Sequence, residues 1–331
     1  MRCARRAPDT VSGPANGPDL AAPETGAVVM GTGIVSVALS LDGAQPLSRI
    51  LLVLTAVTWG ALALLVPARA LRNPQRFRAD ARKPAALSWV AGTAVLGTRF
   101  VLLGWTAPGV ALFVAALVLW GMLIGAVLGH WRTPTVGASL LLTVATQSLA
   151  VLAAVLAVHT RSSWLEVGAL VPFGLGVASY GFVMARFDLR QLTVGRGDQW
   201  IIGGALAIST LAAGDLASGA RSLAVLGRGH GPLEVLAVGL WAASIAWLPA
   251  LVAAEVVHPR LGYDVRRWST VFPLGMYAAC SFVVGQLAEV GPVTSFARAW
   301  AWVALAGWAA VTAAMVSKLF AFRQDDSSRS A

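Results

Sequence analysis

Ten apolar stretches dominate this chain, and each is close to the length that a helix needs to cross a bilayer. Only 12% of the 331 residues are charged, roughly half the share found in soluble domains. Because lipid offers no hydrogen-bond partner to an open strand edge, such stretches cross a membrane as helices. We therefore predict an all-α integral membrane protein with ten transmembrane helices, at residues 25–41, 50–66, 84–105, 108–129, 135–158, 164–185, 199–218, 233–255, 268–288 and 299–317.

The ten stretches alternate in polarity along the chain. Ser, Thr, Asn, Gln and charged residues number 23 in the odd-numbered stretches and 9 in the even-numbered ones. The odd-numbered stretches begin 59, 51, 64 and 69 residues apart, which divides the chain into five helical hairpins inserted in the same sense. Polar side chains avoid lipid, so we predict inner odd-numbered helices around a central pore and even-numbered helices facing lipid. A chain of this design moves something across a membrane.

Basic residues gather in alternate loops of the chain. With the N-terminus inside, the cytoplasmic segments hold 19 of the 25 Lys and Arg residues, and the external segments hold five. This distribution follows the positive-inside rule, so the net charge of +10 indicates a lipid bilayer as the partner and not a nucleic acid. We predict a multi-pass protein of the cell membrane (plasma or inner) with both termini in the cytoplasm.

The two ends of the chain are polar and flank a single membrane domain. Residues 1–23 hold four prolines and no apolar core, so they form no signal peptide, and we expect a disordered cytoplasmic tail. The channel or transporter domain covers residues 24–320, and residues 321–331 form a second, loose cytoplasmic tail. The two cysteines, Cys3 and Cys280, lie in different regions, so we expect neither a disulfide nor a metal site, and no other cofactor.

Hydroxyl and amide side chains recur every four residues in two of the polar stretches, as in Thr32, Ser36 and Ser40. This spacing puts side chains on one helical face, which predicts stripes along a shared path. Small and hydroxylated residues also form tight contacts between membrane helices, and that alternative stays open for each of them. The predicted pore-lining residues are Thr32, Gly33, Ser36, Ser40, Ser139, Thr143, Thr146, Gln147, Ser209, Thr210, Gly275 and Ala279.

Two charged residues, Arg99 and Asp215, lie deep in the polar stretches. Arg99 is about 15 residues into the third stretch and Asp215 about 16 into the seventh, so both are expected at one depth near the external side. An isolated charge in a membrane is costly, and pairing is the usual remedy. We predict that the two are close together or share a water-filled vestibule. A free Arg99 would concentrate anions at the outer mouth.

Two short motifs are more specific than the composition. The first stretch contains Met30-Gly-Thr-Gly-Ile-Val-Ser36, and the ninth contains Trp268-x-x-x-Phe272-Pro273. Both resemble the tellurite-resistance and dicarboxylate-transporter family, which includes the plant slow anion channels. The first motif is similar to that of the branch that transports malate and sulfite. The resemblance covers about residues 24–320, and the second motif is its most specific part.

The resemblance implies a homotrimer of separate pores, each formed by five inner helices and closed by a phenylalanine. At the matching motif this gate is Phe272, and Phe282, which lies deeper in the stretch, is the reserve candidate. Pro273 lacks a backbone donor and is expected to kink the helix beside the gate. The implied substrates are small anions, namely chloride, nitrate, sulfite or C4-dicarboxylates such as malate. The family's roles include malate transport, sulfite efflux and tellurite resistance.

These features favour a passive, phenylalanine-gated anion channel or uniporter and not an enzyme. One alternative is a proton-coupled dicarboxylate or sulfite carrier that uses Asp215, the deep carboxylate. A membrane haem protein or enzyme is a remote alternative, because all four histidines lie at the ends of stretches or in loops. A receptor or scaffold without permeation is disfavoured by the short loops. No P-loop motif occurs, so transport would follow a gradient or be coupled to one.

Overall fold

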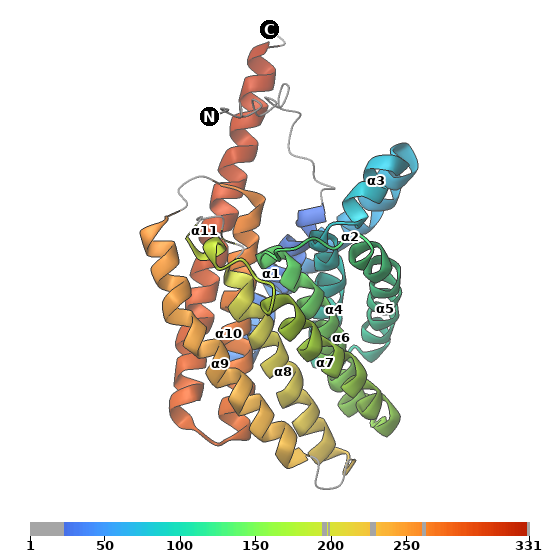
Figure 1. The fold of residues 1–331 in the computed structure, drawn as a ribbon, viewed down its shortest axis with the longest axis vertical. Coiled ribbons are helices and arrows are strands. Elements are labelled where there is room, and N and C mark those ends of the chain that lie inside the picture. Colours follow the sequence, from blue (N-terminus) through green and yellow to red (C-terminus); the bar gives the residue numbers. More distant parts are fainter. Residues whose placement is uncertain (1–22, 194–196, 198, 226–229, 260–262, 330–331) are drawn as a thin grey trace, which may run out of the picture.

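The computed structural model describes residues 23–193, 197, 199–225, 230–259 and 263–329 (Figure 1). Their secondary structure is helical apart from one isolated bridge between Thr135 and Phe187. Within these residues, nine helices are long and apolar enough to cross a membrane. A further apolar helix, α1 (Gly26–Asp42), has only 17 residues. The predicted all-α membrane fold is therefore confirmed, while the tail predicted at residues 1–23 lies outside the described residues except for its last position.

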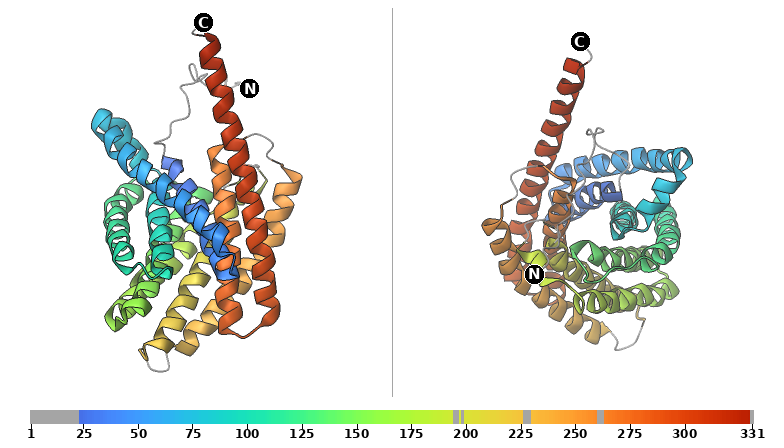
Figure 2. Two further views of the ribbon diagram at one scale, coloured as in Figure 1. Left: turned by 180° about the vertical axis from the view of Figure 1, so that it is seen from behind. Right: turned by 45° about the horizontal axis from the view of Figure 1, so that its top comes forward.

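Five helices form a closed inner bundle, in which each helix contacts two neighbours. The order around the bundle is α1, α4, α6, α8, α10 and back to α1 (Figure 2). All five begin at one face, which we call the N-terminal face, and end at the opposite, C-terminal face. The bounds of the other four inner helices are Ser88–Leu102 for α4, Leu141–Thr160 for α6, Trp200–Ser222 for α8 and Trp268–Leu287 for α10.

An outer helix follows each inner helix in the chain and packs against it. Each outer helix also contacts the next inner helix around the bundle, so it bridges two neighbours. The right-hand view of Figure 2 shows this outer layer around the inner one. The outer helices are α2 (Gln45–Arg72), α5 (Thr106–Leu128), α7 (Ser163–Met184), α9 (His230–Val257) and α11 (Gly291–Arg329).

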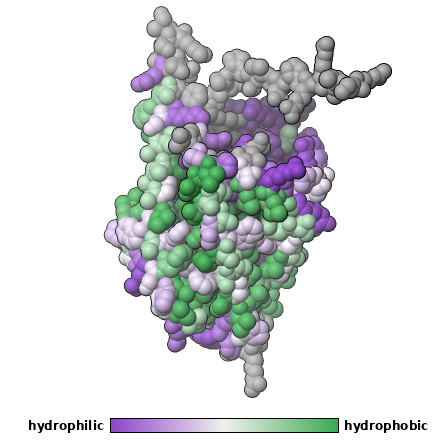
Figure 3. Space-filling model, turned by 60° about the vertical axis from the view of Figure 1, so that its left-hand side comes forward, coloured by the Kyte–Doolittle hydropathy of each residue, from purple (hydrophilic) through white to green (hydrophobic). Residues whose placement is uncertain are grey.

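Burial separates the two layers. In the most apolar part of each span, 72–94% of the residues are buried for α4, α6, α8 and α10, against 11–22% for the outer helices. Hydrophobic side chains cover the middle height of the face drawn in Figure 3, and hydrophilic ones gather toward its ends. Since an exposed apolar surface of this extent marks a contact with another apolar medium, the outer layer is the surface that meets lipid. The predicted alternation of buried polar helices and exposed apolar helices agrees with this packing.

Tryptophan side chains join the two layers. In the described part of the chain, four outer helices donate an indole N–H to a hydroxyl of the next inner helix. A buried indole N–H needs a partner, and lipid provides none, so these bonds orient each outer helix on its neighbour. The pairs are Trp59 Nε1 to Thr93 Oγ1 (2.9 Å), Trp120 Nε1 to Thr146 Oγ1 (3.0 Å), Trp241 Nε1 to Ser281 Oγ (2.9 Å) and Trp308 Nε1 to Thr32 Oγ1 (3.1 Å).

Two helical segments extend beyond the bundle at the N-terminal face (Figure 1). The short helix α3 (Pro74–Ala81) follows α2, and the side chain of Asn73 caps it by accepting the Arg76 N–H at 3.1 Å. At the other end of the chain, α11 continues as a helix through Arg329. The described part of the segment from residue 321 is therefore helical, while the cytoplasmic tail at residues 321–331 stays a prediction. The segment lacks Gly and Pro, so nothing in it stops a helix that is already formed.

Candidate functional site

The first turns of the inner helices enclose a cavity of about 270 Å³ at the N-terminal face, which we name the N-terminal vestibule. Lys83 and Arg266 lie in its wall together with one acidic residue, Glu24. Ser88 and Ser269 add hydroxyl groups to the same wall. A concave surface with an excess of positive charge concentrates anions. The three charged side chains of the wall sum to one positive charge, and Lys83 also pairs with Asp80 outside the wall at 2.8 Å.

A second, much smaller cavity lies midway along the inner helices, and we call it the axial cavity. Its volume is about 20 Å³, which is room for about one water molecule. Thr98 and Ser148 bring the hydroxyl groups of its wall, and the other lining side chains are apolar. The axis of the bundle is therefore closed to a hydrated anion at this depth. The wall consists of Ile34 and Val37, Val95 and Thr98, Ser148 and Val151, Ile208 and Leu211, and Met276.

The two cavities follow the same register on all five inner helices. On each helix, a residue of the vestibule wall is followed seven positions later by a residue of the axial-cavity wall. Positions i, i+3 and i+7 share one helical face, so the residue three after the vestibule position lies between the cavities. We call these five residues the intervening layer. The sets are Ala27–Met30–Ile34, Ser88–Ala91–Val95, Leu141–Val144–Ser148, Ile201–Gly204–Ile208 and Ser269–Phe272–Met276.

Phe272 is the aromatic residue of the intervening layer, and it is fully buried. Two other members of the layer, Ala91 and Gly204, have little or no side chain. Pro273 lies within the continuous α10 and packs on Gly204, where a Cβ atom would be 2.8 Å from the Pro273 ring. The register thus puts Phe272 between the vestibule and the axial cavity. The bend predicted at Pro273 stays a prediction.

Phe282, the reserve candidate for the gate, is also buried. It lies six residues after Met276, which lines the axial cavity. At 3.6 residues per turn, this spacing rotates a side chain by about a third of a turn from the Met276 face. Phe282 therefore lies off the face that connects the vestibule with the axial cavity.

Five of the predicted pore-lining side chains hydrogen-bond to the outer layer and not toward the axis. The spacing of four residues in α1 and α6 does put these side chains on a common helical face, but that face packs on an outer helix. In an apolar medium a hydroxyl is stabilised by bonding across a helix pair, and that these five residues line the path stays a prediction. Thr32 and Thr146 accept the N–H groups of Trp308 and Trp120, Ser36 Oγ donates to the Ser48 carbonyl (2.7 Å), Thr143 bonds with Ser179 (3.0 Å), and Gln147 donates to the Phe173 carbonyl (3.2 Å).

Two of the predicted pore-lining glycines lie at close helix contacts. A Cβ atom at Gly33 would lie 2.8 Å from Val95 of α4, and one at Gly275 would lie 2.7 Å from Ile34 of α1. Small residues at such positions let membrane helices approach closely. Gly33 and Gly275 therefore set the packing of α1 against its two inner neighbours.

The remaining predicted pore-lining residues have varied surroundings. Ser209 and Thr210 each donate to a carbonyl one turn earlier in α8. Ser40, at the end of α1, carries a carbonyl that accepts from the side chain of Gln45. Ser139 lines a separate cavity beside α3. Ala279 is buried and lies three residues after Met276, the residue of α10 that lines the axial cavity. On each of the other four inner helices, the residue at this spacing, such as Val37 after Ile34, also lines that cavity.

Arg99 is fully buried at the end of α4, and it does not pair with Asp215. Its Nε and Nη2 atoms donate to Ser48 Oγ of α2 at 3.2 and 3.0 Å. Ser48 Oγ in turn donates to the Ser36 carbonyl at 2.7 Å. In the inner bundle α6 separates α4 from α8, so a similar depth does not bring Arg99 and Asp215 together. The predicted pair is therefore wrong.

Asp215 is half-buried four residues after Leu211, on the α8 face that lines the axial cavity. A second carboxylate, Glu166 at the start of α7, interacts electrostatically with it. Glu166 is fully buried, and both of its carboxylate oxygens lack a hydrogen-bond partner in the described part of the chain. The carboxylate lies against Gly219, where a Cβ atom would be 2.5 Å from either oxygen.

Glu166 was not among the candidate residues predicted from the sequence, although it is the acidic residue near the start of the otherwise apolar stretch 164–185. The structure adds what the sequence lacked, because it brings Glu166 of the outer helix α7 against the inner helix that carries Asp215. Two carboxylates therefore lie near the C-terminal mouth of the bundle. Proton uptake there would remove negative charge from the mouth.

Residues 21–316 match the family described as voltage-dependent anion channel. The chain belongs to this family. The match spans the inner bundle, both cavities and Phe272, and it confirms the resemblance that the two motifs carry. The family is described as one of anion channels, and this description agrees with the expectation that the chain is not an enzyme.

Two curated relatives are 35% identical to the chain over 135 residues. Both are uncharacterized membrane proteins of Mycobacterium tuberculosis, one from strain H37Rv and one from strain CDC 1551. The matched region covers 37% of this chain and 64% of each relative, so the chain spans less than two thirds of their length. The descriptions of these relatives agree with a membrane location.

Proposed function

We propose that the chain is a passive anion channel or uniporter whose path follows the axis of the inner bundle and whose gate is Phe272. The single observation that carries this proposal is the shared register of the vestibule, the intervening layer and the axial cavity. Anions gather in the vestibule because Lys83 and Arg266 lie in its wall. They meet Phe272 next, and a movement of its phenyl group opens the way into an apolar constriction of the kind that gates by dewetting.

The proposal extends to topology, assembly and substrate. The N-terminal face is cytoplasmic, because the basic segments 67–83 and 186–193 lie at that face. The helix α1 is the tenth span and completes five hairpins, and three such chains form a homotrimer with separate pores in the cell membrane. The substrates are chloride, nitrate, sulfite or a C4-dicarboxylate such as malate, following the resemblance of the Met30 to Ser36 motif.

Current across planar bilayers tests the gate. We expect Phe272→Ala to raise the anion current, because the phenyl group no longer fills the intervening layer. Phe282→Ala is the matched control, since it removes the same buried group away from the path. Removing a buried phenyl group costs about 3–5 kcal/mol of stability, so Phe272→Leu is measured beside it. Unchanged current in both folded Phe272 variants, or an equal rise in Phe282→Ala, contradicts the gate.

A second candidate is a proton-coupled carrier, and the observation that favours it is the buried Glu166, whose oxygens lack a hydrogen-bond partner among the described residues and which interacts electrostatically with Asp215. In this case, malate or sulfite uptake into liposomes responds to an imposed pH gradient. Asp215→Asn abolishes the response, while Glu289→Gln, which changes an exposed carboxylate at the same face, retains it. Uptake that ignores the pH gradient in the wild type excludes coupling and leaves the passive channel.

A further inference from the structure

The short helix α3 separates two cavities that differ sharply in chemistry. One is apolar and has a volume of about 240 Å³, and it lies among α2, α3, α4 and α5. The other has a volume of about 630 Å³ and lies between α3 and the loop that follows α5. Phe77 and Ala81 of α3 face the first cavity, and Ala79, on the same short helix, faces the second. We call them the apolar cavity and the basic cavity.

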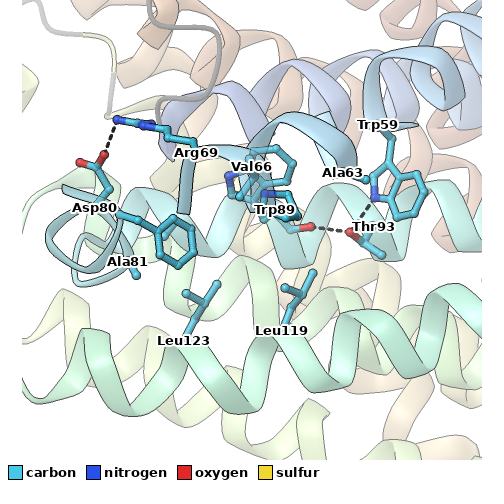
Figure 4. A pocket seen from close by; sticks show the side chains of 13 residues that line it. Trp59, Ala63, Val66, Arg69, Asp80, Ala81, Trp89, Thr93, Leu119 and Leu123 are labelled. Carbon is cyan, nitrogen blue, oxygen red and sulfur yellow. Dashed lines mark hydrogen bonds and ion pairs between the residues drawn. The ribbon is translucent and has the colours of Figure 1, made fainter. Parts of the chain in front are cut away.

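The apolar cavity is shaped by side chains from two outer helices. Figure 4 shows Leu119 and Leu123 of α5 pointing across the space toward Ala63 and Val66 of α2. Trp59 closes the end nearest the middle of the bundle, where its N–H is satisfied by Thr93. The walls thus offer almost no free polar group, so a ligand there must be hydrocarbon.

An ion pair marks the other end of the apolar cavity. Arg69 Nη2 lies 2.8 Å from Asp80 Oδ2 (Figure 4). Lys83 Nζ lies 2.8 Å from the other carboxylate oxygen of Asp80. Lys83 also lines the basic cavity. The polar edge of the apolar cavity and the basic cavity therefore meet at the end of α3.

Among the described residues, the wall of the basic cavity carries cationic side chains and no acidic one. Arg82 and Arg132 line it from α3 and from the loop after α5, and neither has an ion pair in the described part of the chain. Trp131 lines the same cavity, and its Nε1 is buried without a hydrogen-bond partner among the described residues. Two guanidinium groups and an unpaired indole N–H form a donor set for phosphate oxygens. The volume lies in the range of about 300–1,000 Å³ that holds small ligands.

We propose that α3 and α5 bind one anionic phospholipid, with its phosphate headgroup in the basic cavity and an acyl chain in the apolar cavity. Charge complementarity identifies the occupant, because a hydrocarbon slot beside a cationic pocket fits a lipid that is both apolar and acidic. The site lies at the N-terminal face of helices that present their apolar surface to lipid, so a bilayer leaflet supplies the ligand directly. Because Lys83 and Pro84 line the basic cavity and also the N-terminal vestibule, the bound headgroup lies beside the entrance of the path.

Native mass spectrometry of the full chain in detergent tests the proposal. The probes are phosphatidylglycerol and phosphatidylcholine with identical acyl chains. We expect phosphatidylglycerol to bind more tightly than phosphatidylcholine. In the double variant Arg82→Ala/Arg132→Ala the ratio of the two affinities should fall by roughly 30-fold, because each basic side chain contributes about 1 kcal/mol to binding an anionic lipid. The matched control is Arg72→Ala/Arg78→Ala, which removes two exposed charges of the same region that line neither cavity.

A second pair of variants tests the acyl chain. Ala63→Phe fills the apolar cavity, and Ala61→Phe adds the same group on the exposed face of α2. We expect the first to weaken phosphatidylglycerol binding and the second to leave it unchanged, with thermal unfolding confirming that both variants are folded. Anion current is not part of this readout, so the result stands whether or not Phe272 is the gate.

Four outcomes overturn the proposal. Equal binding of the two lipids removes the role of the headgroup, and an equal loss in Arg72→Ala/Arg78→Ala indicates unspecific attraction. Binding of inorganic pyrophosphate that Ala63→Phe leaves unchanged, with no lipid retained, indicates a soluble phosphate ligand. A change in oligomeric mass in Ala63→Phe without any bound lipid indicates that a second copy of the chain covers the site.

Discussion

The hydrogen bond between Trp120 of α5 and Thr146 of α6 leads to an asymmetric prediction. Thr146 Oγ1 donates to the Leu142 carbonyl at 2.8 Å and accepts the Trp120 N–H at 3.0 Å. After Trp120→Phe, the threonine hydroxyl keeps its intrahelical bond. After Thr146→Val, the indole N–H of Trp120 is left without its partner at a depth where the surrounding medium is hydrocarbon. The two substitutions break the same bond, but only the second leaves an unsatisfied donor.

The magnitudes follow from this difference. An interhelical hydrogen bond in a membrane contributes about 0.6 kcal/mol on average and at most about 1.7 kcal/mol. A buried donor without a partner costs about 1–3 kcal/mol. We therefore expect Thr146→Val to lower the free energy of unfolding by about 1–3 kcal/mol. The hydrogen-bond part of the Trp120→Phe loss stays near 0.6 kcal/mol, and the smaller ring adds a packing cost that the double-mutant cycle cancels.

Unfolding of the purified protein in mixed detergent measures all four members of the cycle. In the double variant Trp120→Phe/Thr146→Val no donor is left unsatisfied, so the phenylalanine substitution should recover part of the Thr146→Val loss. The coupling energy between the two sites should fall between about 0.6 and 3 kcal/mol. Strict additivity of the two single losses would refute the reasoning, because it means that the two side chains do not interact in the bilayer-like medium.

Two further predictions concern the inner bundle. Gly203→Ala should lower stability by about 1–3 kcal/mol, because the new Cβ atom would meet Tyr277 Oη, whereas Gly239→Ala, with open space around it, should be neutral or slightly stabilising in the same thermal-unfolding assay. Arg266→Gln should lower anion current by about a factor of two at low salt. Two unit charges about 10 Å apart in water attract by about 0.4 kcal/mol, and losing this attraction about halves the anion concentration in the vestibule. Arg267→Gln, which removes a neighbouring charge outside the vestibule wall, should not lower the current. Current that is insensitive to Arg266 at every salt concentration contradicts the role of the vestibule.

The layered fold could be predicted from the sequence because a polar side chain on a lipid-facing helix surface is energetically unfavourable. The counts of polar residues therefore separated the inner helices from the outer ones, and burial agrees. Helix ends were harder to predict. The prediction began the last helix at residue 299 and ended it at 317, whereas α11 runs from Gly291 to Arg329. Hydropathy marks the part of a helix inside lipid, but backbone hydrogen bonding continues beyond it wherever no glycine or proline intervenes.

The facing of each polar residue could not be predicted from spacing alone. Thr32 and Ser36 do share a helical face, as their separation of four residues indicates, but a single sequence does not tell which neighbour that face meets. The missing signal was in the outer helices. Trp120 and Trp308 lie in the middle of apolar stretches, away from the interfacial belt where tryptophan is usual. An indole N–H at that depth requires an acceptor on an adjacent helix, and the hydroxyls supply it.

The position of the gate candidate needed both kinds of information. The motif at Trp268 singled out Phe272, and the sequence put it close to the cytoplasmic end of its stretch. The structure shows that this is one helical turn from the axial cavity, since Met276 lines that cavity four residues later. In contrast, Arg99 and Asp215 were paired on depth alone. Position around the bundle separates them, and depth carries no information about it.

The contacts between the layers also decide the chemistry of the path. Most hydroxyls of the inner helices are committed to the outer layer or to their own backbone, and this includes the two in the wall of the axial cavity, since Thr98 donates to the Ala94 carbonyl and Ser148 to the Ala145 carbonyl. On the proposed path, an anion that passes Phe272 would enter a constriction that binds it weakly. Conduction requires sites from which the ion can leave, and a wall rich in free hydroxyl or cationic groups would hold the anion instead. The proposal needs positive charge only where anions would be collected, and Lys83 and Arg266 lie in the wall of the vestibule at that end of the path.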